Sequence, residues 1–355
     1  MAKDSLAQKL KKFLEKIKIL DPVNPNRSTG IVNGKASGIL NWNDIPYPHF
    51  YELYKSLMAN FWVADSINMS NDKKQFVNLT EQEKNAYLKI IGLLATFDGP
   101  QTRYMLRVTD YLTDPSVFSI TSVIAQQEAE HNRSYAYVLS SVVPSETQTK
   151  TFELGREDEV VIRRNQEIMD AYNKFLEEPT IENLLESMVQ STILEGLFFY
   201  SGFAFFYNLA RQQKMVGTST MISYINRDEL VHGKTMGDFF RAILAENPEY
   251  NTPELAEGIY KTFDRAVQYE TDWSRHILKG VAGIDLVEME GYIKYRANKM
   301  LRTLGLTDLY EEYTDNPMPW IKGFVDNFNN VKTDFFEQES RQYAAPNEDN
   351  GFDDL

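Results

Sequence analysis

Two Glu-x-x-His pairs are the residues of this sequence with the clearest capacity for chemistry. Glu128 precedes His131 by three positions, and Glu229 precedes His232 by the same spacing. Residues three apart project from one face of a helix, so each pair could offer a carboxylate and an imidazole to one metal ion. The chain has only 4 histidines, which makes the repeat informative. A single pair of this kind is more often a solvated helix face with a nearby histidine, so the surrounding sequence must decide.

Each pair is accompanied by one further acid in an apolar run. Four-helix bundles that hold two transition-metal ions use two such pairs and one carboxylate from each of two other helices. Glu195 is the lone acid in the apolar stretch 192–207, and Asp98 ends the apolar run 87–98, although Asp-Gly-Pro is also an ordinary turn signal. A lone buried carboxylate is costly unless it is paired or metal-bound. The sequence therefore predicts a dinuclear metal site formed by Asp98, Glu128, His131, Glu195, Glu229 and His232.

Composition limits the alternatives. The chain has 355 residues, is 43% hydrophobic, carries a net charge of −14 and contains no cysteine. The negative charge argues against nucleic acid or an anionic membrane as the main partner. Without cysteine, disulfides and thiolate catalysis are excluded, and oxygen and nitrogen ligands remain, which suit iron or manganese without choosing between them. The N-terminus lacks the apolar core of a signal peptide, and the run 192–207 contains an acid and two glycines, so we expect a core helix and a soluble, cytoplasmic protein.

Apolar positions recur at helical spacing, which predicts an all-α fold with one large domain. We expect an extension over residues 1–45 that wraps the bundle, a metal-binding helical domain over 46–338 and a disordered acidic tail over 339–355. Thr80 and Glu83 form the pattern of a capping box, and prolines at 144 and 179 fall where helices should stop or restart. Helices are predicted near 47–61, 80–98, 101–112, 116–142, 157–177, 180–210, 217–245, 253–279 and 286–304, with an irregularity at Asp98-Gly99-Pro100.

Several aromatic and aliphatic residues share the faces of the predicted ligands. Tyr135 follows His131 by four positions, so it should lie within one turn of the metals. Phe199 and Phe203 follow Glu195 by four and eight, and Ile225 precedes Glu229 by four. These residues could form a dry lining beside the site, but ordinary core packing explains the spacing equally well.

Taken together, these motifs resemble the small, radical-generating subunit of class I ribonucleotide reductase. The resemblance runs from about Gly30 through the tail. It is carried by Glu128-x-x-His131-x-x-x-Tyr135, by Glu195 with Phe199 and Phe203, and by Ile225-Asn-Arg-Asp228-Glu229-x-x-His232. Trp62, in Asn-Phe-Trp, matches the tryptophan near the metal site of that family, and Asp228 matches the aspartate that links it to a ligand histidine.

The resemblance implies a ferritin-like helical homodimer with a pair of iron ions, manganese ions or one of each. The metal pair would react with oxygen, or with an oxidant from a flavodoxin-like activase, to form a radical on Tyr135, shielded by Phe199, Phe203 and Ile225. The radical would pass through His131, Asp228, Trp62 and a tail tyrosine, here Tyr343, to a large subunit docked on the C-terminal tail. That subunit would reduce ribonucleoside diphosphates or triphosphates for DNA synthesis. Ile120 and Ile124 stand where some relatives carry tryptophan, so the route of the activating electron stays open.

Two other functions remain to be separated from this one. A ligand-binding oxidase of the same fold would lack the dedicated radical route and the docking tail. A ferritin-like storage protein would be a shorter chain that assembles into a shell, and would need neither Trp62 nor Asp228. Metal analysis with electron paramagnetic resonance after reconstitution separates these possibilities.

Overall fold

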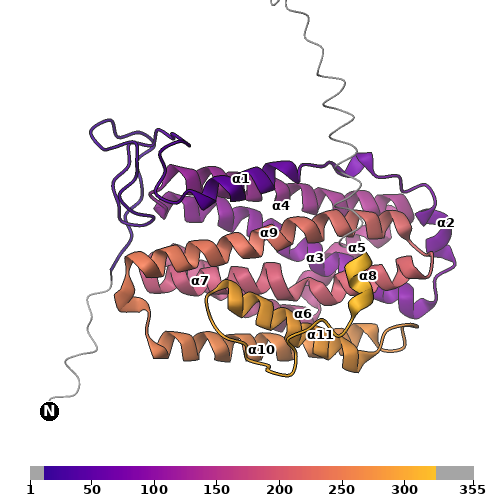
Figure 1. Cartoon of the computed structure of the whole chain (residues 1–355). Coiled ribbons are helices and arrows are strands. Elements are labelled where there is room, and N and C mark those ends of the chain that lie inside the picture. The colour runs from indigo at the N-terminus through magenta and orange to yellow at the C-terminus, as the bar shows by residue number, and fades with distance from the viewer. Residues whose placement is uncertain (1–11, 325–355) are drawn as a thin grey trace, which may run out of the picture. The chain divides into compact units, whose positions relative to one another are not determined.

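The computed structural model describes residues 12–324, and from His49 to Thr303 these form helices joined by short connections (Figure 1). Within this range the only β pairing is an isolated antiparallel bridge between Phe13 and Thr180, so the predicted all-α fold is confirmed. The α-helices are α1 (His49–Ala59), α2 (Asp72–Val77), α3 (Glu81–Val108), α4 (Pro115–Val142), α5 (Ser145–Glu157), α6 (Glu159–Glu177), α7 (Ile181–Ile193), α8 (Tyr200–Arg211), α9 (Val216–Glu246), α10 (Pro253–Leu278) and α11 (Leu286–Thr303).

Capping side chains fix where α3 and α4 begin. At α3 the predicted capping box is present: the Thr80 hydroxyl accepts from the Glu83 amide at 3.2 Å, and the Glu83 carboxylate accepts from the Thr80 amide at 2.8 Å. Asp114 caps α4 by accepting from the Ser116 amide at 2.8 Å. Each bond satisfies an amide that the first turn leaves without a helical partner. The caps therefore set the register of the helices that carry Asp98 and Glu128.

The predicted division into helices over 80–98 and 101–112, with an irregularity at Asp98-Gly99-Pro100, is wrong, because α3 runs without interruption from Glu81 to Val108. Pro100 lacks an amide hydrogen, and a proline inside a helix costs roughly 3 kcal/mol. Phe97 and Met105, on either side of the proline, are both fully buried, and burying one such side chain contributes about 1.5–3 kcal/mol. The Thr102 hydroxyl also donates to the Asp98 carbonyl at 2.7 Å. Packing therefore outweighs the local turn signal.

The single helix predicted over 180–210 is divided in the structure. Between α7 and α8 lies a π-helical segment, Leu194–Phe198, which contains Glu195. The stretch Ile181–Arg211 is long and apolar enough to cross a membrane, but its apolar window is entirely buried inside the protein. It is a core helix, as its glycines and its acid indicate.

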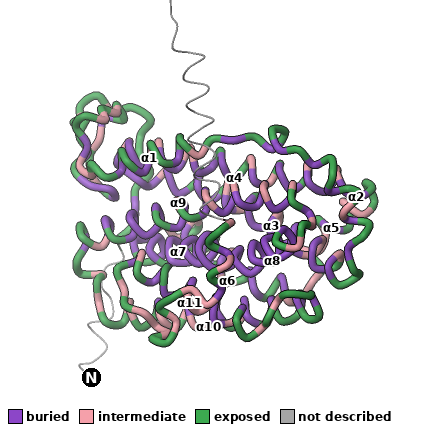
Figure 2. Tube along the Cα trace, turned by 45° about the vertical axis from the view of Figure 1, so that its right-hand side comes forward, coloured by how far each residue is buried: buried purple, intermediate pink, exposed green. Residues whose placement is uncertain are grey.

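The four elements that carry the predicted ligands meet in the core. Helix α3 packs along α4, α7 packs along α9, and α4 also contacts α9. In Figure 2 these helices form the buried interior, while α5, α10 and α11 present exposed outer faces. Two short elements, α2 and α5, were not predicted, because neither has a long apolar period.

Before α1 the chain has no helix from residue 12 onward. The Leu14 amide donates to the Pro179 carbonyl at 2.7 Å, and the Ile31 amide donates to Glu246 at 2.9 Å, so this segment is fixed to α9 and to the α6–α7 connection. Residues up to Met318 form one compact unit, and a second unit begins at Pro319. The predicted tail over 339–355, including Tyr343, lies outside the described residues, and the proposed domain limits stay predictions.

Candidate dinuclear metal centre

The six predicted ligand residues converge on one place in the core, and all six are fully buried. Asp98 comes from α3, Glu128 and His131 from α4, Glu195 from the π-helical segment, and Glu229 and His232 from α9. Their ligand atoms form two groups, within each of which the atoms lie no more than 4.8 Å apart. The groups are Asp98, Glu128 and His131, and Glu128, Glu195, Glu229 and His232. Glu128 belongs to both groups, so its carboxylate could bridge two ions.

Imidazole nitrogens and carboxylate oxygens face one another inside this cluster. His232 Nδ1 lies 2.8 Å from Glu128 Oε1 and 2.9 Å from Glu229 Oε2. His131 Nδ1 lies 3.0 Å from Glu229 Oε1. The two rings are 5.8 Å apart between centroids. Each histidine therefore presents the same nitrogen to the carboxylates.

Outer hydrogen bonds set the tautomer of both histidines. His232 Nε2 lies 2.9 Å from Gln127 Oε1, and the Gln127 amide nitrogen is already used in a bond to the Leu57 carbonyl at 3.1 Å. His131 Nε2 lies 3.1 Å from the Asp228 carboxylate. Both Nε2 atoms must then carry the hydrogen, which leaves the Nδ1 lone pairs directed at the cluster. This arrangement is typical of histidines that bind metal.

The residues fit two divalent cations. Buried polar atoms that make no hydrogen bond include both oxygens of Asp98, both of Glu128, one each of Glu195 and Glu229, and His131 Nδ1. Buried polar atoms normally have partners, and buried charges are paired or bind metal. Four ionised carboxylates carry a charge of −4, which two divalent ions would neutralise. Oxygen and imidazole donors without thiolate suit iron or manganese.

The electrostatics of the cluster point the same way. Burial and the neighbouring Glu195 and Glu229 carboxylates raise the pKa of Glu128 to about 8. Burial and the charge of Glu128 raise the pKa of Asp98, and burial with Glu195 raises that of Glu229. Like charges at short range disfavour ionisation, so these carboxylates need cations to remain charged together at neutral pH.

Gln101 and Gln127 are residues of the site that the ligand spacing did not predict. The Gln101 amide donates to the Glu195 carboxylate and, at 2.9 Å, to the Ser191 hydroxyl. Its oxygen accepts from Tyr172 at 2.6 Å. Both glutamines are buried amides in apolar helices, Gln101 three residues after Asp98 and Gln127 directly before Glu128. That placement is the signal that could have found them.

Tyr135 lies beside the cluster, as its spacing on α4 predicts. The side chain is 1% exposed, and its hydroxyl makes no hydrogen bond of normal geometry to any described residue, although it lies close to the Asp98 carboxylate. Burial, followed by the charges of Asp98, Glu229 and Glu128, raises the pKa of Tyr135 well above its usual value. The phenol is therefore protonated at neutral pH and lies close enough to Asp98 to feel its charge.

The three residues predicted to shield Tyr135 are all in the dry core. Phe199 is 1% exposed, and Phe203 and Ile225 are fully buried. The Phe199 and Phe203 rings lie 5.9 Å apart, and Phe199 also meets Phe97 at 5.9 Å. Phe199 directly precedes α8 and Phe203 lies in its first turn, four and eight residues after Glu195, whereas Phe97 directly precedes Asp98 in α3.

A hydrogen-bonded chain leads from the cluster toward the surface. Asp228 Oδ2 accepts from Trp62 Nε1 at 2.7 Å and lies 3.1 Å from His131 Nε2. The Trp62 and His131 rings are stacked, with centroids 6.0 Å apart. Trp62 follows α1 in the chain and is 7% exposed, whereas Asp228 is fully buried. The Asp228 carboxylate thus joins Trp62, 166 positions away in the chain, to His131.

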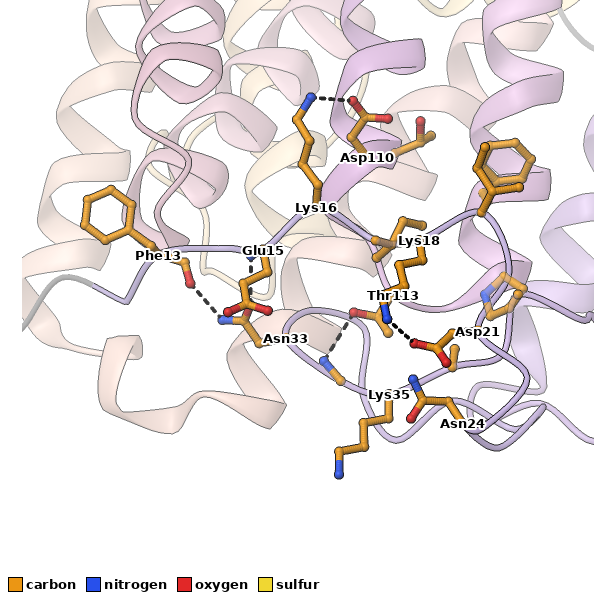
Figure 3. Close-up of a pocket in the computed structure, with 18 residues that line it drawn as sticks. Phe13, Glu15, Lys16, Lys18, Asp21, Asn24, Asn33, Lys35, Asp110 and Thr113 are labelled. Atoms are coloured by element: carbon orange, nitrogen blue, oxygen red, sulfur yellow. Dashed lines mark hydrogen bonds and ion pairs between the residues drawn. The ribbon is translucent and has the colours of Figure 1, made fainter.

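A surface pocket at the N-terminal segment does not contribute to this centre. It has a volume of about 770 Å³ and is lined by residues of the segment 13–38 and of 109–118 (Figure 3). Two of its lysines are paired, Lys16 with Asp110 at 3.1 Å and Lys18 with Asp21 at 2.9 Å. None of the six clustered residues lines it.

Comparison with known proteins identifies the family. The family model for the ribonucleotide reductase small chain matches residues 39–317. The chain belongs to the ribonucleotide reductase small-chain family. It is 51% identical to the ribonucleoside-diphosphate reductase subunit beta of Halalkalibacterium halodurans over 343 residues, which cover 96% of this chain and 99% of that protein.

Solved structures of this family share the fold. One, described as a class I ribonucleotide reductase of Bacillus halodurans, is 50% identical, with a TM-score of 0.84 over 87% of this chain and 99% of the other. The ribonucleotide reductase R2 subunit of Clostridium botulinum is 36% identical, with a TM-score of 0.85 over 88% and 99% of the two chains. The family resemblance, the ferritin-like fold, and the function as a radical-generating reductase subunit are confirmed.

Proposed function

We propose that this chain forms a radical on Tyr135 beside two metal ions and passes it to a large subunit that reduces ribonucleoside diphosphates. The observation that carries the proposal is the chain Trp62–Asp228–His131, which joins an edge of the bundle to the buried cluster. A storage protein has no need of such a connection. The diphosphate level is proposed because the 51% identical relative is a ribonucleoside-diphosphate reductase subunit.

The six buried residues would hold the two ions. Asp98, Glu128 and His131 would bind one, and Glu195, Glu229 and His232 would bind the other, with Glu128 shared. We propose iron, manganese or one ion of each, since the ligand types suit both metals. After reaction with dioxygen or with an oxidant supplied by an activase, the bound ion pair would supply the oxidising power that removes one electron from a tyrosine.

Tyr135 is placed to lose that electron and to retain the resulting radical. A tyrosine phenol already holds its proton at neutral pH, and burial and the charge of Asp98 raise the pKa of Tyr135 further. Oxidation makes a phenol strongly acidic, so the proton on Oη would move toward the cluster carboxylates, of which Asp98 perturbs Tyr135 most. Phe199, Phe203 and Ile225 would exclude water and reductants.

The radical would leave through the hydrogen-bonded chain. Asp228 fixes the orientation of both His131 and Trp62 through one oxygen, so protons and electrons can be exchanged between rings without rearrangement. Trp62 is the slightly exposed end of this chain and would exchange with Tyr343 of the tail. Tyr343 itself lies outside the described residues.

The remaining features of the proposal concern assembly. We propose a homodimer in the cytoplasm that engages its large subunit through residues 339–355, with a flavodoxin-like protein as a candidate activase. The homodimer and the large subunit are proposed from the family match. The tail is proposed from its acidic composition and its apolar anchors, Phe352 and Leu355.

The test is metal reconstitution followed by low-temperature electron paramagnetic resonance. Purified protein loaded with iron or manganese and oxidant should contain two ions per chain and show a tyrosyl signal. Tyr135→Phe should keep both ions and lose the signal, because phenylalanine cannot be oxidised in this way. The matched control is Tyr87→Phe, which removes another buried hydroxyl, bonded to Thr218 at 2.8 Å, and should keep the signal. A signal that persists in Tyr135→Phe would place the radical elsewhere.

A further inference from the structure

Two buried arginines reach the π-helical segment that carries Glu195. Arg164, from α6, is 1% exposed, and Arg296, from α11, is 5% exposed. Arg164 Nη2 donates to the Phe198 carbonyl. Arg296 Nε donates to the Gly196 carbonyl at 3.0 Å. Each guanidinium group therefore donates a hydrogen bond to a backbone carbonyl of the same five-residue segment, Leu194–Phe198.

The backbone of this segment needs such donors. A π-helical turn bonds residues five apart, and the change back to α-helical spacing at α8 leaves a carbonyl without a helical donor. A buried carbonyl without a partner is costly, so an outside donor stabilises this conformation relative to a regular α-helix. The two arginines thus donate to backbone carbonyls of the π-helical segment, whereas carbonyls inside a regular α-helix accept from the amides of the helix itself.

The surroundings of each arginine fix its position. Arg164 Nε donates to Glu270 at 2.8 Å, and Glu270 also accepts from Ser201 of α8. The Arg164 guanidinium lies 4.0 Å from the centroid of the Phe198 ring. Arg296 stacks on Tyr200, 3.5 Å from the ring centroid. Contacts are therefore made to both the segment and the first turns of α8.

Arg296 differs from Arg164 in having no carboxylate partner among the described residues. Its Nη2 makes no hydrogen bond. An arginine buried for fold stability alone would be expected to pair with an acid, since burying an unpaired charge is costly. Its bond to Gly196, the residue directly after Glu195, is the interaction that its position provides.

We propose that Arg164 and Arg296 are positioning residues that fix the π-helical segment Leu194–Phe198 and thereby hold the Glu195 carboxylate in reach of the second metal ion. The inference rests on the proposed function, because it requires two ion sites. It distinguishes those sites: Glu195 belongs to the group with Glu229 and His232, and not to the group with Asp98 and His131. Loss of the arginine contacts should therefore weaken the binding of one ion and leave the affinity for the other unchanged.

The experiment measures the two Mn²⁺ affinities of the full-length protein by counting free Mn²⁺ with electron paramagnetic resonance, beside the melting temperature. In Arg296→Gln one ion should bind about tenfold more weakly, the lower end of the range for residues that orient metal ligands, and the other should be unchanged. Arg296→Lys retains a cationic donor for the Gly196 carbonyl and should restore the lost affinity. The same selective loss is expected in the double variant Arg164→Gln/Glu270→Gln, which leaves no buried charge unpaired.

Arg265→Gln is the matched control. Arg265 pairs with Glu167 across the same two helices, α10 and α6, at 3.0 Å, but on the surface. Arg265→Gln should change the affinity for neither ion. If the double variant fails to fold, Arg296→Gln decides, because it leaves no acid unpaired. Two ions bound at wild-type affinity in Arg296→Gln, or both weakened equally as the melting temperature falls, would overturn the inference. Wild-type protein that binds fewer than two ions would instead overturn the proposed function, on which the inference depends.

Discussion

Glu195 is a proposed ligand that tests the two-ion site sharply, because, like Asp98, it lies in a helical stretch without histidine, where only the predicted convergence of helices assigns it a metal. Replacing it with alanine removes a carboxylate from the group that also contains Glu128, Glu229 and His232. Glu195→Ala should therefore lose dinuclear binding and retain at most one ion, measured as metal content after dialysis. The control is Glu186→Ala, an acid of α7 that pairs with Lys174 at the surface. Two ions retained at wild-type affinity in Glu195→Ala would contradict the assignment.

Trp62 tests the proposed route rather than the metal site. In Trp62→Phe the ring can still pack, but it can neither donate to Asp228 nor be oxidised readily. Turnover with the large subunit, counted per tyrosyl radical, should fall to background while both ions stay bound. Trp42→Phe is the control, because among the described residues the Trp42 ring packs at a tilt against Tyr51 and Tyr54, away from the cluster. Wild-type turnover per radical in Trp62→Phe would exclude this route.

The six clustered residues could be predicted because each obeys one of two rules that can be applied to the sequence. A carboxylate and an imidazole three apart can share a helix face, and a lone acid in an apolar run needs a cation. Gln101 and Gln127 obey no such rule, since an amide can be satisfied by many neighbours. Arg164 and Arg296 are harder still, because a charged residue in a helix is normally read as exposed.

At the scale of elements, the π-helical segment depends on a close contact with α11. A Cβ built on Gly196 would lie 1.9 Å from Met300 Sδ, and one on Gly233 would lie 3.3 Å from the same atom. Met300 thus packs between the segment that carries Glu195 and the helix that carries Glu229. No sequence pattern shows this, because the contact depends on how three helices pack.

Gly196→Ala should destabilise the protein although alanine is the better helix former. Overpacking costs about 1–3 kcal/mol and outweighs a propensity gain of about 0.5–1 kcal/mol. Urea unfolding should show the loss, and Met300→Ala in the same chain should recover part of it. Gly258→Ala in α10 is the control with the opposite sign, because its Cβ would meet nothing within 4 Å. Equal effects of the two substitutions would show that the Met300 contact is unimportant.

The helices themselves were largely predictable, and the exceptions have physical causes. The limits of α4, α6, α9, α10 and α11 differ from the predicted ranges by no more than two residues, because strong apolar periods and capping residues coincide there. At Pro100 the local signal for a break was overruled by burial on both sides of it. At Leu194–Phe198 nothing in the apolar pattern distinguishes a π turn from an α turn.

At the scale of the whole molecule, the two halves contribute equivalent parts to one centre. Helices α3 and α4 supply an acid and a Glu-x-x-His pair, and α7 to α9 supply the same set in the same order. That order could be taken from the sequence. The contact between α4 and α9, which places Glu128 in both groups, could not be predicted from the sequence. The apolar period of a helix does not show which other helix it packs against.

At the scale of the whole molecule, binding to the large subunit is proposed to depend on the last residues of the chain. Gly351-Phe-Asp-Asp-Leu355 carries two apolar anchors in an acidic segment that cannot form a core of its own. Such a segment can gain affinity by ordering on a partner groove, but the cost of ordering keeps the contact modest and easily competed. A peptide of the last roughly twenty residues should therefore inhibit nucleotide reduction by displacing this subunit.

Two variants separate docking from radical transfer. Deletion of residues 344–355 should leave metal binding and the tyrosyl signal intact while it removes turnover with the large subunit, because it removes the proposed anchors and none of the clustered residues. Tyr343→Phe should keep subunit affinity but stop turnover, because phenylalanine retains an aromatic ring and lacks the oxidisable hydroxyl. Affinity is measured by titration of the large subunit, and a peptide with Phe352 and Leu355 replaced by alanine is the control for inhibition. If the truncated chain supported nucleotide reduction at the wild-type rate, the tail would not be the docking element.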